Sequence, residues 1–136
     1  MKGNKEIISK LNELLTDELT AVNQYIVHSE MCSNWGYGRL HDAIEKRAIQ
    51  EMKHAEKLIE RILFLSGKPV VSNLNKISIG EKVETQIRND LAAEEGALKS
   101  YNESVDLAAR ELDNGNRDLL ESILHYEEEH YDWLEA

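Results

Sequence analysis

The chain has 136 residues, a length that suits one domain with a modest hydrophobic core. Its formal net charge of −10 argues against nucleic-acid binding, which needs a basic face, and fits attraction of cations. No apolar run is long enough for a membrane span, MKGNKEIISK lacks a signal-peptide pattern, and the single cysteine, Cys32, has no partner for an internal disulfide. Together these features predict a cytoplasmic protein without membrane or nucleic-acid partners.

Turn-forming residues divide the sequence into four segments of helical character. The breaks fall at WGYG (35–38), at SGKP (66–69) and at DNGN (113–116), and Gly80 ends an irregular stretch that follows Pro69. At the second break we expect Gly67 to adopt a left-handed C-cap conformation. The predicted helices cover residues 4–35, 39–66, 81–112 and 116–136.

Each segment carries an apolar stripe at helical spacing. In chain order, the stripes contain Leu11, Leu15, Val22 and Tyr25; Ile44, Ala48, Leu58, Ile62 and Leu65; Val83, Ile87, Leu91, Leu98, Tyr101 and Val105; and Leu120, Ile123 and Leu134. Four amphipathic helices bury these stripes against one another in a four-helix bundle. Because only the middle connection, of about 14 residues, is long enough to cross a bundle, we predict an all-α, antiparallel, ferritin-like fold. Its long crossover lies between helices two and three, and residues 1–136 form a single domain.

A carboxylate interrupts every stripe near its middle. In the second and fourth segments a histidine follows three residues after the glutamate, in EMKH (51–54) and EEEH (127–130), which puts both side chains on one helix face. The six residues are Glu18, Glu51, His54, Glu94, Glu127 and His130. Buried carboxylates without a counter-charge are costly, and these stripes contain no lysine or arginine.

Two divalent cations would balance four carboxylates, and two imidazoles would complete their coordination. One glutamate from each of two helices, with Glu-x-x-His from each of the other two, is the ligand pattern of ferritin-like di-iron proteins. We therefore predict that the six residues bind two metal ions in a catalytic centre, and iron suits this oxygen-rich site best. The alternative is that they are surface groups on wrongly phased helices, which fits any one glutamate better than the complete set.

Three further residues are candidates for auxiliary roles. Tyr25 lies two turns from Glu18 and Tyr101 two turns from Glu94, so either hydroxyl could hydrogen-bond a ligand or supply an electron, although core packing is the commoner role. Met52 lies in a second apolar stripe of the second segment, which predicts a second buried face, most simply in a two-fold homodimer. That stripe contains Ile49, Met52, Ile59 and Leu63. A methionine thioether can bind haem iron, but the stripe alone favours a space-filling role.

The chain resembles the bacterioferritins, the haem-containing branch of the ferritins, over essentially its whole length. The likeness is carried by MKGNKEIISKLNELL, NQY at 23–25, EMKHAE at 51–56, ERILFL at 60–65, IGE at 79–81 and EEEHYDWLE near the end. The resemblance implies that Glu51 and Glu127 bridge two irons. Glu18 and His130, like Glu94 and His54, would be terminal ligands. Met52 and its copy across a dimer two-fold would bind haem b, shared between two subunits, which receives electrons from a small ferredoxin.

By the same resemblance, we expect a ferroxidase that stores and detoxifies iron, oxidising Fe(II) with oxygen or hydrogen peroxide in a homo-oligomer, a 24-subunit shell in the family. Lys46 and Gln50 replace the His and Asp of an additional iron site found in some members. The sequence ends at WLEA, where the family normally continues into a fifth helix. These departures leave open an alternative function: a haem-binding dimer for electron transfer or iron trafficking without a mineral-storing cage. A di-metal enzyme with another substrate and a purely structural bundle are more distant alternatives.

Overall fold

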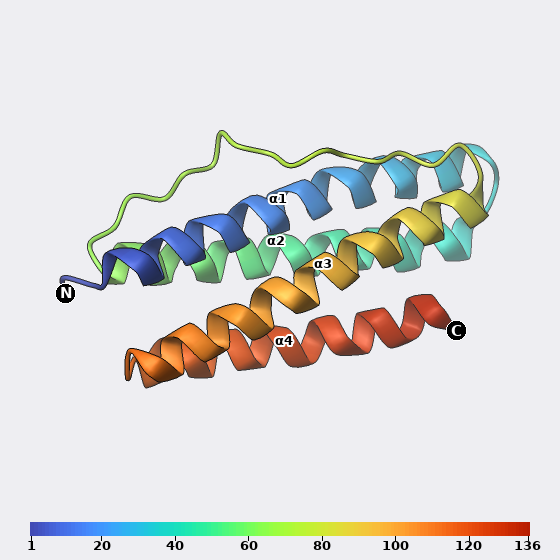
Figure 1. Ribbon diagram of the computed structural model, residues 1–136. Coiled ribbons are helices and arrows are strands. Elements are labelled where there is room, and N and C mark those ends of the chain that lie inside the picture. The colour runs from blue at the N-terminus through green and yellow to red at the C-terminus, as the bar shows by residue number, and fades with distance from the viewer.

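The computed structural model describes residues 1–136 and consists of four helices and their connections (Figure 1). The helices are α1 (Lys5–Asn34), α2 (Gly38–Phe64), α3 (Val83–Arg110) and α4 (Asn114–Glu135). Each begins and ends within two residues of the range expected from the sequence. The prediction of an all-α four-helix bundle is confirmed. None of the four helices combines the length and apolar character that a membrane-spanning segment needs.

Local hydrogen bonds explain where the helices begin and end. The Asn4 side chain caps α1 by accepting bonds from the backbone N–H groups of Glu6 and Ile7. At the end of α2, the left-handed residue is Ser66, with φ of 61°, so the expectation that Gly67 takes this role is wrong. Gly67 is needed for a different reason: a Cβ there would lie 2.8 Å from a methyl carbon of Ile8.

The four helices form two antiparallel pairs, α1 with α2 and α3 with α4 (Figure 1). The crossover between α2 and α3, residues 65–82, runs along the outer side of α1 from one end of the bundle to the other (Figure 1). It brings the start of α3 to the end of the bundle where α2 begins. As a result, α1 and α3 run in opposite directions past each other, and this orientation determines the contacts in the metal centre described below.

Polar side chains of α1 hold the crossover in place. They are spaced by four or eight residues and accept hydrogen bonds from its backbone N–H groups, which would otherwise lack protein partners. Asn12 accepts from Val70, Thr20 from Asn75, Gln24 from Ser78 and His28 from Gly80, at 2.8–3.1 Å. Sequence reasoning missed this row because it followed apolar spacing only, although the polar repeat at 12, 16, 20, 24 and 28 was visible.

The hydrophobic core has two parts with a polar zone between them. The larger part contains Leu11, Leu15, Leu58, Ile62 and Leu120, and the smaller part contains Tyr25, Cys32, Ile44 and Ala48. On α3 the predicted apolar stripe is displaced from the buried face, since most of its members are only half-buried. The buried residues of α3 are Gln86, Asp90, Glu94, Tyr101, Ser104, Leu107 and Ala108.

The displacement on α3 has a physical cause in buried polar contacts. Asp90 accepts a hydrogen bond from the Gln24 amide and lies 2.9 Å from His28 Nδ1. Because His28 Nε2 accepts the N–H of Gly80, its Nδ1 carries the proton and donates to Asp90. The polar residues of this network satisfy one another, so α3 turns them inward where a hydropathy pattern places them outside.

Candidate metal centre

The polar zone of the core is formed by the six residues that the sequence analysis selected. α1 and α3 each contribute one glutamate, and α2 and α4 each contribute a glutamate and the histidine one turn later. All six side chains are buried: Glu18, Glu51, His54, Glu94, Glu127 and His130. The structure therefore brings every candidate ligand together at one place. Because all six side chains are buried, the alternative that they are surface groups on wrongly phased helices is wrong.

The six residues form two overlapping groups of potential metal ligands. One group is Glu18, Glu51, His54 and Glu127, and the other is Glu51, Glu94, Glu127 and His130. Within each group, one ligand atom from every residue lies within 4.8 Å of the others. Glu51 and Glu127 belong to both groups, so the arrangement has the form of two adjacent cation positions that share two carboxylates. Among the residues that belong to one group only, the grouping places His54 with Glu18 and His130 with Glu94.

Each of the four carboxylates has one oxygen without a hydrogen-bond partner. These buried atoms are Glu18 Oε2, Glu51 Oε1, Glu94 Oε2 and Glu127 Oε2. An unpartnered carboxylate oxygen in a protein interior costs free energy, and native proteins rarely leave four at one place. Oxygen atoms aimed into a common space, with two imidazoles beside them, are a donor set that suits Fe, Mn or Zn. The residues present therefore fit a pair of divalent cations.

Burial and mutual repulsion change the protonation of the cation-free centre. Desolvation, followed by the nearby Glu18 charge, raises the pKa of Glu51 well above its ordinary value. Desolvation also raises the pKa of Glu94 to about 8, although His130 opposes the shift. Desolvation lowers the pKa of His54, but its hydrogen bond with Glu127 and the nearby Glu18 carboxylate outweigh this and bring the pKa to about 9. Without a cation, protons take over part of the charge balance.

Two tyrosines contact the centre, and each binds the glutamate of the other helix. Tyr25 on α1 donates its hydroxyl to Glu94 Oε1 on α3, at 2.7 Å. Tyr101 on α3 donates to Glu18 Oε1 on α1, at 2.5 Å. The sequence pattern suggested that either tyrosine could bind a ligand but did not reveal this exchange, which depends on the antiparallel course of α1 and α3.

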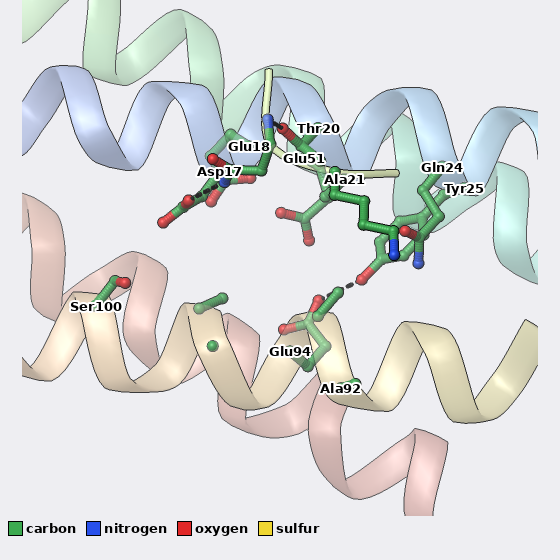
Figure 2. A pocket seen from close by; sticks show the side chains of 15 residues that line it. Asp17, Glu18, Thr20, Ala21, Gln24, Tyr25, Glu51, Ala92, Glu94 and Ser100 are labelled. Carbon is green, nitrogen blue, oxygen red and sulfur yellow. Dashed lines mark hydrogen bonds between the residues drawn. The ribbon is translucent and has the colours of Figure 1, made fainter. Parts of the chain in front are cut away.

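A cavity of about 260 Å³ leads from the molecular surface to the centre, between α1 and α3 (Figure 2). Its outer lining includes Asn75 and Lys76 of the crossover, and its inner lining includes the buried Glu18, Glu51 and Glu94. Several of the other lining residues are small, among them Ala21, Ala92, Ala93, Gly96 and Ala97. The centre is thus buried within the bundle and still reachable by small solutes.

Met52 lies apart from this centre, on the outer surface of α2. Its side chain is 45% exposed, beside Ile49, which is 42% exposed, and Leu63 of the same stripe is 59% exposed. The second apolar stripe of α2 therefore does not pack inside this chain, apart from the half-buried Ile59, which contacts the core. A thioether in an open apolar surface fits a flat apolar ligand such as haem, whereas it does not fit the space-filling role in the core of one chain.

Comparison with known proteins agrees with this architecture. A model of the ferritin-like domain matches residues 8–136. Over 136 residues the chain is 41% identical to a bacterioferritin of Rhodobacter capsulatus, covering 100% of this chain and 84% of that protein. It is 38% identical to bacterioferritin BfrA of Mycobacterium tuberculosis and 39% identical to a bacterioferritin of Brucella melitensis, covering 100% of this chain and 86% and 84% of those proteins. The chain therefore belongs to the ferritin-like family and, within it, to the bacterioferritins.

Proposed function

We propose that this protein takes up Fe(II), oxidises it to Fe(III) at the six-residue centre, and stores the product. The observation that carries the proposal is the set of four buried carboxylates, each with one unpartnered oxygen facing a shared space. Four negative charges match two divalent cations, and no lysine or arginine forms an ion pair with these carboxylates, whose only ion-pair partners are His54 and His130. Membership of the bacterioferritins supports iron as the metal.

In this proposal the ligand roles follow the two overlapping groups. Glu51 and Glu127 bridge two Fe(II) substrate ions, Glu18 and His54 complete one position, and Glu94 and His130 complete the other. The Nδ1 atoms of both histidines face the carboxylates, at 3.1 Å from Glu127 for His54 and 2.8 Å from Glu94 for His130. These nitrogens are therefore the ones that bind metal, which requires neutral imidazoles.

The contribution of the protein to this oxidation is mainly electrostatic. Anionic oxygen ligands favour the smaller and more highly charged Fe(III) over Fe(II), so the carboxylates promote loss of an electron from each ion. Two Fe(II) ions supply two electrons, and one O₂ with two protons accepts them to give one hydrogen peroxide. Hydrogen peroxide as the oxidant accepts the same two electrons with two protons and gives two water molecules. The buried site keeps the ions apart from bulk water during this step.

The proposal also includes haem b bound by Met52. The exposed thioether and its apolar neighbours on α2 support a haem held between two copies of the chain, with one methionine from each. Bound haem supplies a one-electron carrier between an external reductant and stored iron. We further propose a homodimer within a larger homo-oligomer, a small ferredoxin as reductant, and a cytoplasmic location, which the single cysteine favours. A haem dimer without storage is less favoured, since it does not require the buried six-residue centre.

An anaerobic Fe(II) titration of the metal-free protein, followed by exposure to oxygen, tests the proposed function. We expect a rapid oxidation phase that saturates at two irons per chain. The electron balance gives oxygen uptake of about one O₂ per two irons when hydrogen peroxide is released, and about one O₂ per four irons when the peroxide oxidises two further Fe(II). Absorbance and an oxygen electrode record both quantities. Slower uptake beyond this point reports on storage. A titration without a break at two irons per chain would contradict a dinuclear ferroxidase centre.

Replacing Met52 with leucine tests the haem site. We expect wild-type protein to bind one haem b per two chains and the Met52→Leu variant to bind none, because leucine keeps the apolar surface and removes the sulfur ligand. Absorbance titration with haem measures the stoichiometry. Met31→Leu is the matched control, since Met31 is a half-buried methionine of α1 that contacts Gln86. Equal haem binding by wild type and Met52→Leu would exclude Met52 as the ligand.

A further inference from the structure

Tyr101 and Tyr25 differ in how many other contacts support the glutamate to which each donates its hydrogen bond. Both rings are fully buried, and both hydroxyls donate to a carboxylate of the opposite antiparallel helix. Glu94, the partner of Tyr25, has a second contact because His130 Nδ1 lies 2.8 Å from the same oxygen. Glu18, the partner of Tyr101, has no second hydrogen bond. In the metal-free centre, the Glu18 and Glu94 carboxylates are therefore supported unequally.

The contacts of Glu18 show what the tyrosine does to this carboxylate. Oε1 accepts the Tyr101 hydroxyl, while Oε2 has no hydrogen-bond partner and lies 3.7 Å from His54 Nδ1. One oxygen is thus held and the other left free toward the space shared with Glu51. A hydrogen bond to a charged acceptor is stronger than one between neutral groups, so it fixes the carboxylate plane effectively. Without it, Glu18 would be free to rotate within the cavity.

Packing fixes the tyrosine in its turn. The Tyr101 ring belongs to the larger core cluster, with leucines and isoleucines of α1, α2 and α4 around it. A buried ring in a close-packed core has little freedom to change rotamer. The hydroxyl is consequently a fixed point on α3 against which the flexible Glu18 side chain of α1 is oriented.

We propose that Tyr101 is a positioning residue that presents Glu18 to the cation position formed by Glu18, Glu51, His54 and Glu127. Its loss weakens cation binding there and leaves the position of Glu94 and His130 unchanged. The inference rests on the proposed function, because it requires that these groups bind metal. A role of Tyr101 in core packing alone makes a different prediction. Its loss would then change the stability of the protein without selectively weakening cation binding at one position.

An anaerobic titration with Co(II) tests this proposal without relying on iron oxidation. Visible absorbance of the bound ion reports how many positions fill and how tightly. For Tyr101→Phe, which keeps the ring in the core, we expect two Co(II) per chain, one of them bound about tenfold more weakly, or about 1.4 kcal/mol. Tyr25→Phe is expected to leave the affinity of the Glu18 position unchanged, because Tyr25 donates to Glu94 at the other position. Tyr131→Phe is the matched control, because Tyr131 donates to Glu95 outside the centre.

A double-mutant cycle separates positioning from packing. In a Glu18→Ala background we expect Tyr101→Phe to cause no further loss of Co(II) affinity, because the carboxylate that it orients is gone. In a Glu94→Ala background the tenfold effect persists. Thermal unfolding of the metal-free variants checks that all of them fold. Unchanged Co(II) affinities in Tyr101→Phe, equal weakening of both positions, or an undiminished effect in the Glu18→Ala background would each overturn the inference. A wild-type protein that fails to bind two Co(II) per chain would instead contradict the proposed function.

Discussion

Replacing Glu51 with glutamine slows the rapid phase of Fe(II) oxidation by about 100-fold or more, while the metal-free protein stays folded. Glu51 is one of two residues common to both ligand groups, so the change affects both cation positions together. Glutamine has nearly the same size but carries no negative charge. Mutation of a group that only supports a metal ligand lowers metal affinity or activity by about 10–100-fold. We therefore expect loss of a ligand shared by both positions to slow oxidation by at least the upper end of that range. Stopped-flow absorbance at two irons per chain measures the rate.

The same substitution has little effect on stability at neutral pH. Burial and the neighbouring Glu18 charge raise the pKa of Glu51 well above its ordinary value, which favours the neutral form of its carboxyl in the metal-free protein. A neutral amide resembles that state, and the free energy of unfolding therefore stays nearly constant. Chemical denaturation of the metal-free proteins makes this comparison.

Glu56→Gln provides the matched control for Glu51→Gln. Glu56 lies on the exposed surface of α2, a little over one turn further along the helix, so the change removes the same charge without touching the centre. It is expected to keep the rapid phase and the two-iron break. Rapid oxidation in Glu51→Gln at the wild-type rate would show that Glu51 is not a shared ligand.

The fold and the cluster of six residues could be predicted because their signals are periodic and local. Breakers such as SGKP and DNGN divide the chain, and Glu-x-x-His spacing puts both side chains on one helix face whatever the partner helix does. The sequence also marked the second stripe of α2 as a separate face, and the exposure of Met52 agrees with that interpretation. Such features need no knowledge of how two helices are placed relative to each other.

Features that depend on the relation between helices could not be predicted in the same way. Asp90 is buried because Gln24 and His28 of α1 form hydrogen bonds with its carboxylate. The spacing of apolar residues on α3 gives no information about these partners on another helix. The reach of Tyr101 to Glu18 requires both the antiparallel course of α1 and α3 and their relative level along the bundle. The prediction for the end of α2 was also wrong. A glycine is needed at position 67 because a side chain there would collide with Ile8, and not because the backbone adopts a left-handed conformation.

The metal-free protein becomes less stable as the pH rises from about 5 to about 9, and divalent cations reverse this trend. Glu94 has a pKa of about 8 in the folded protein against 4.5 ordinarily, so between these values the folded state holds more protons than the unfolded state. Its stabilising contribution is complete below pH 4.5 and is lost as the pH passes through about 8. His54, with a pKa of about 9 against 6.5, acts in the same direction over pH 6.5–9.

Cation binding opposes this dependence because metal ligands must lose their protons. As the pH rises, fewer protons compete at Glu51, Glu94 and His54, and the stabilisation gained from a divalent cation grows. A cation at 100 times its dissociation constant adds about 2.7 kcal/mol, so tighter binding at high pH gives a correspondingly larger shift. Thermal unfolding at pH 6 and pH 8.5, with and without Co(II), measures both trends. The Glu51→Gln variant should show a shallower fall in metal-free stability, since one titrating carboxyl is gone. A metal-free protein that is more stable at pH 8.5 than at pH 6 would mean that the buried carboxylates have counter-charges within the chain, and the electrostatic case for two cations would then fail.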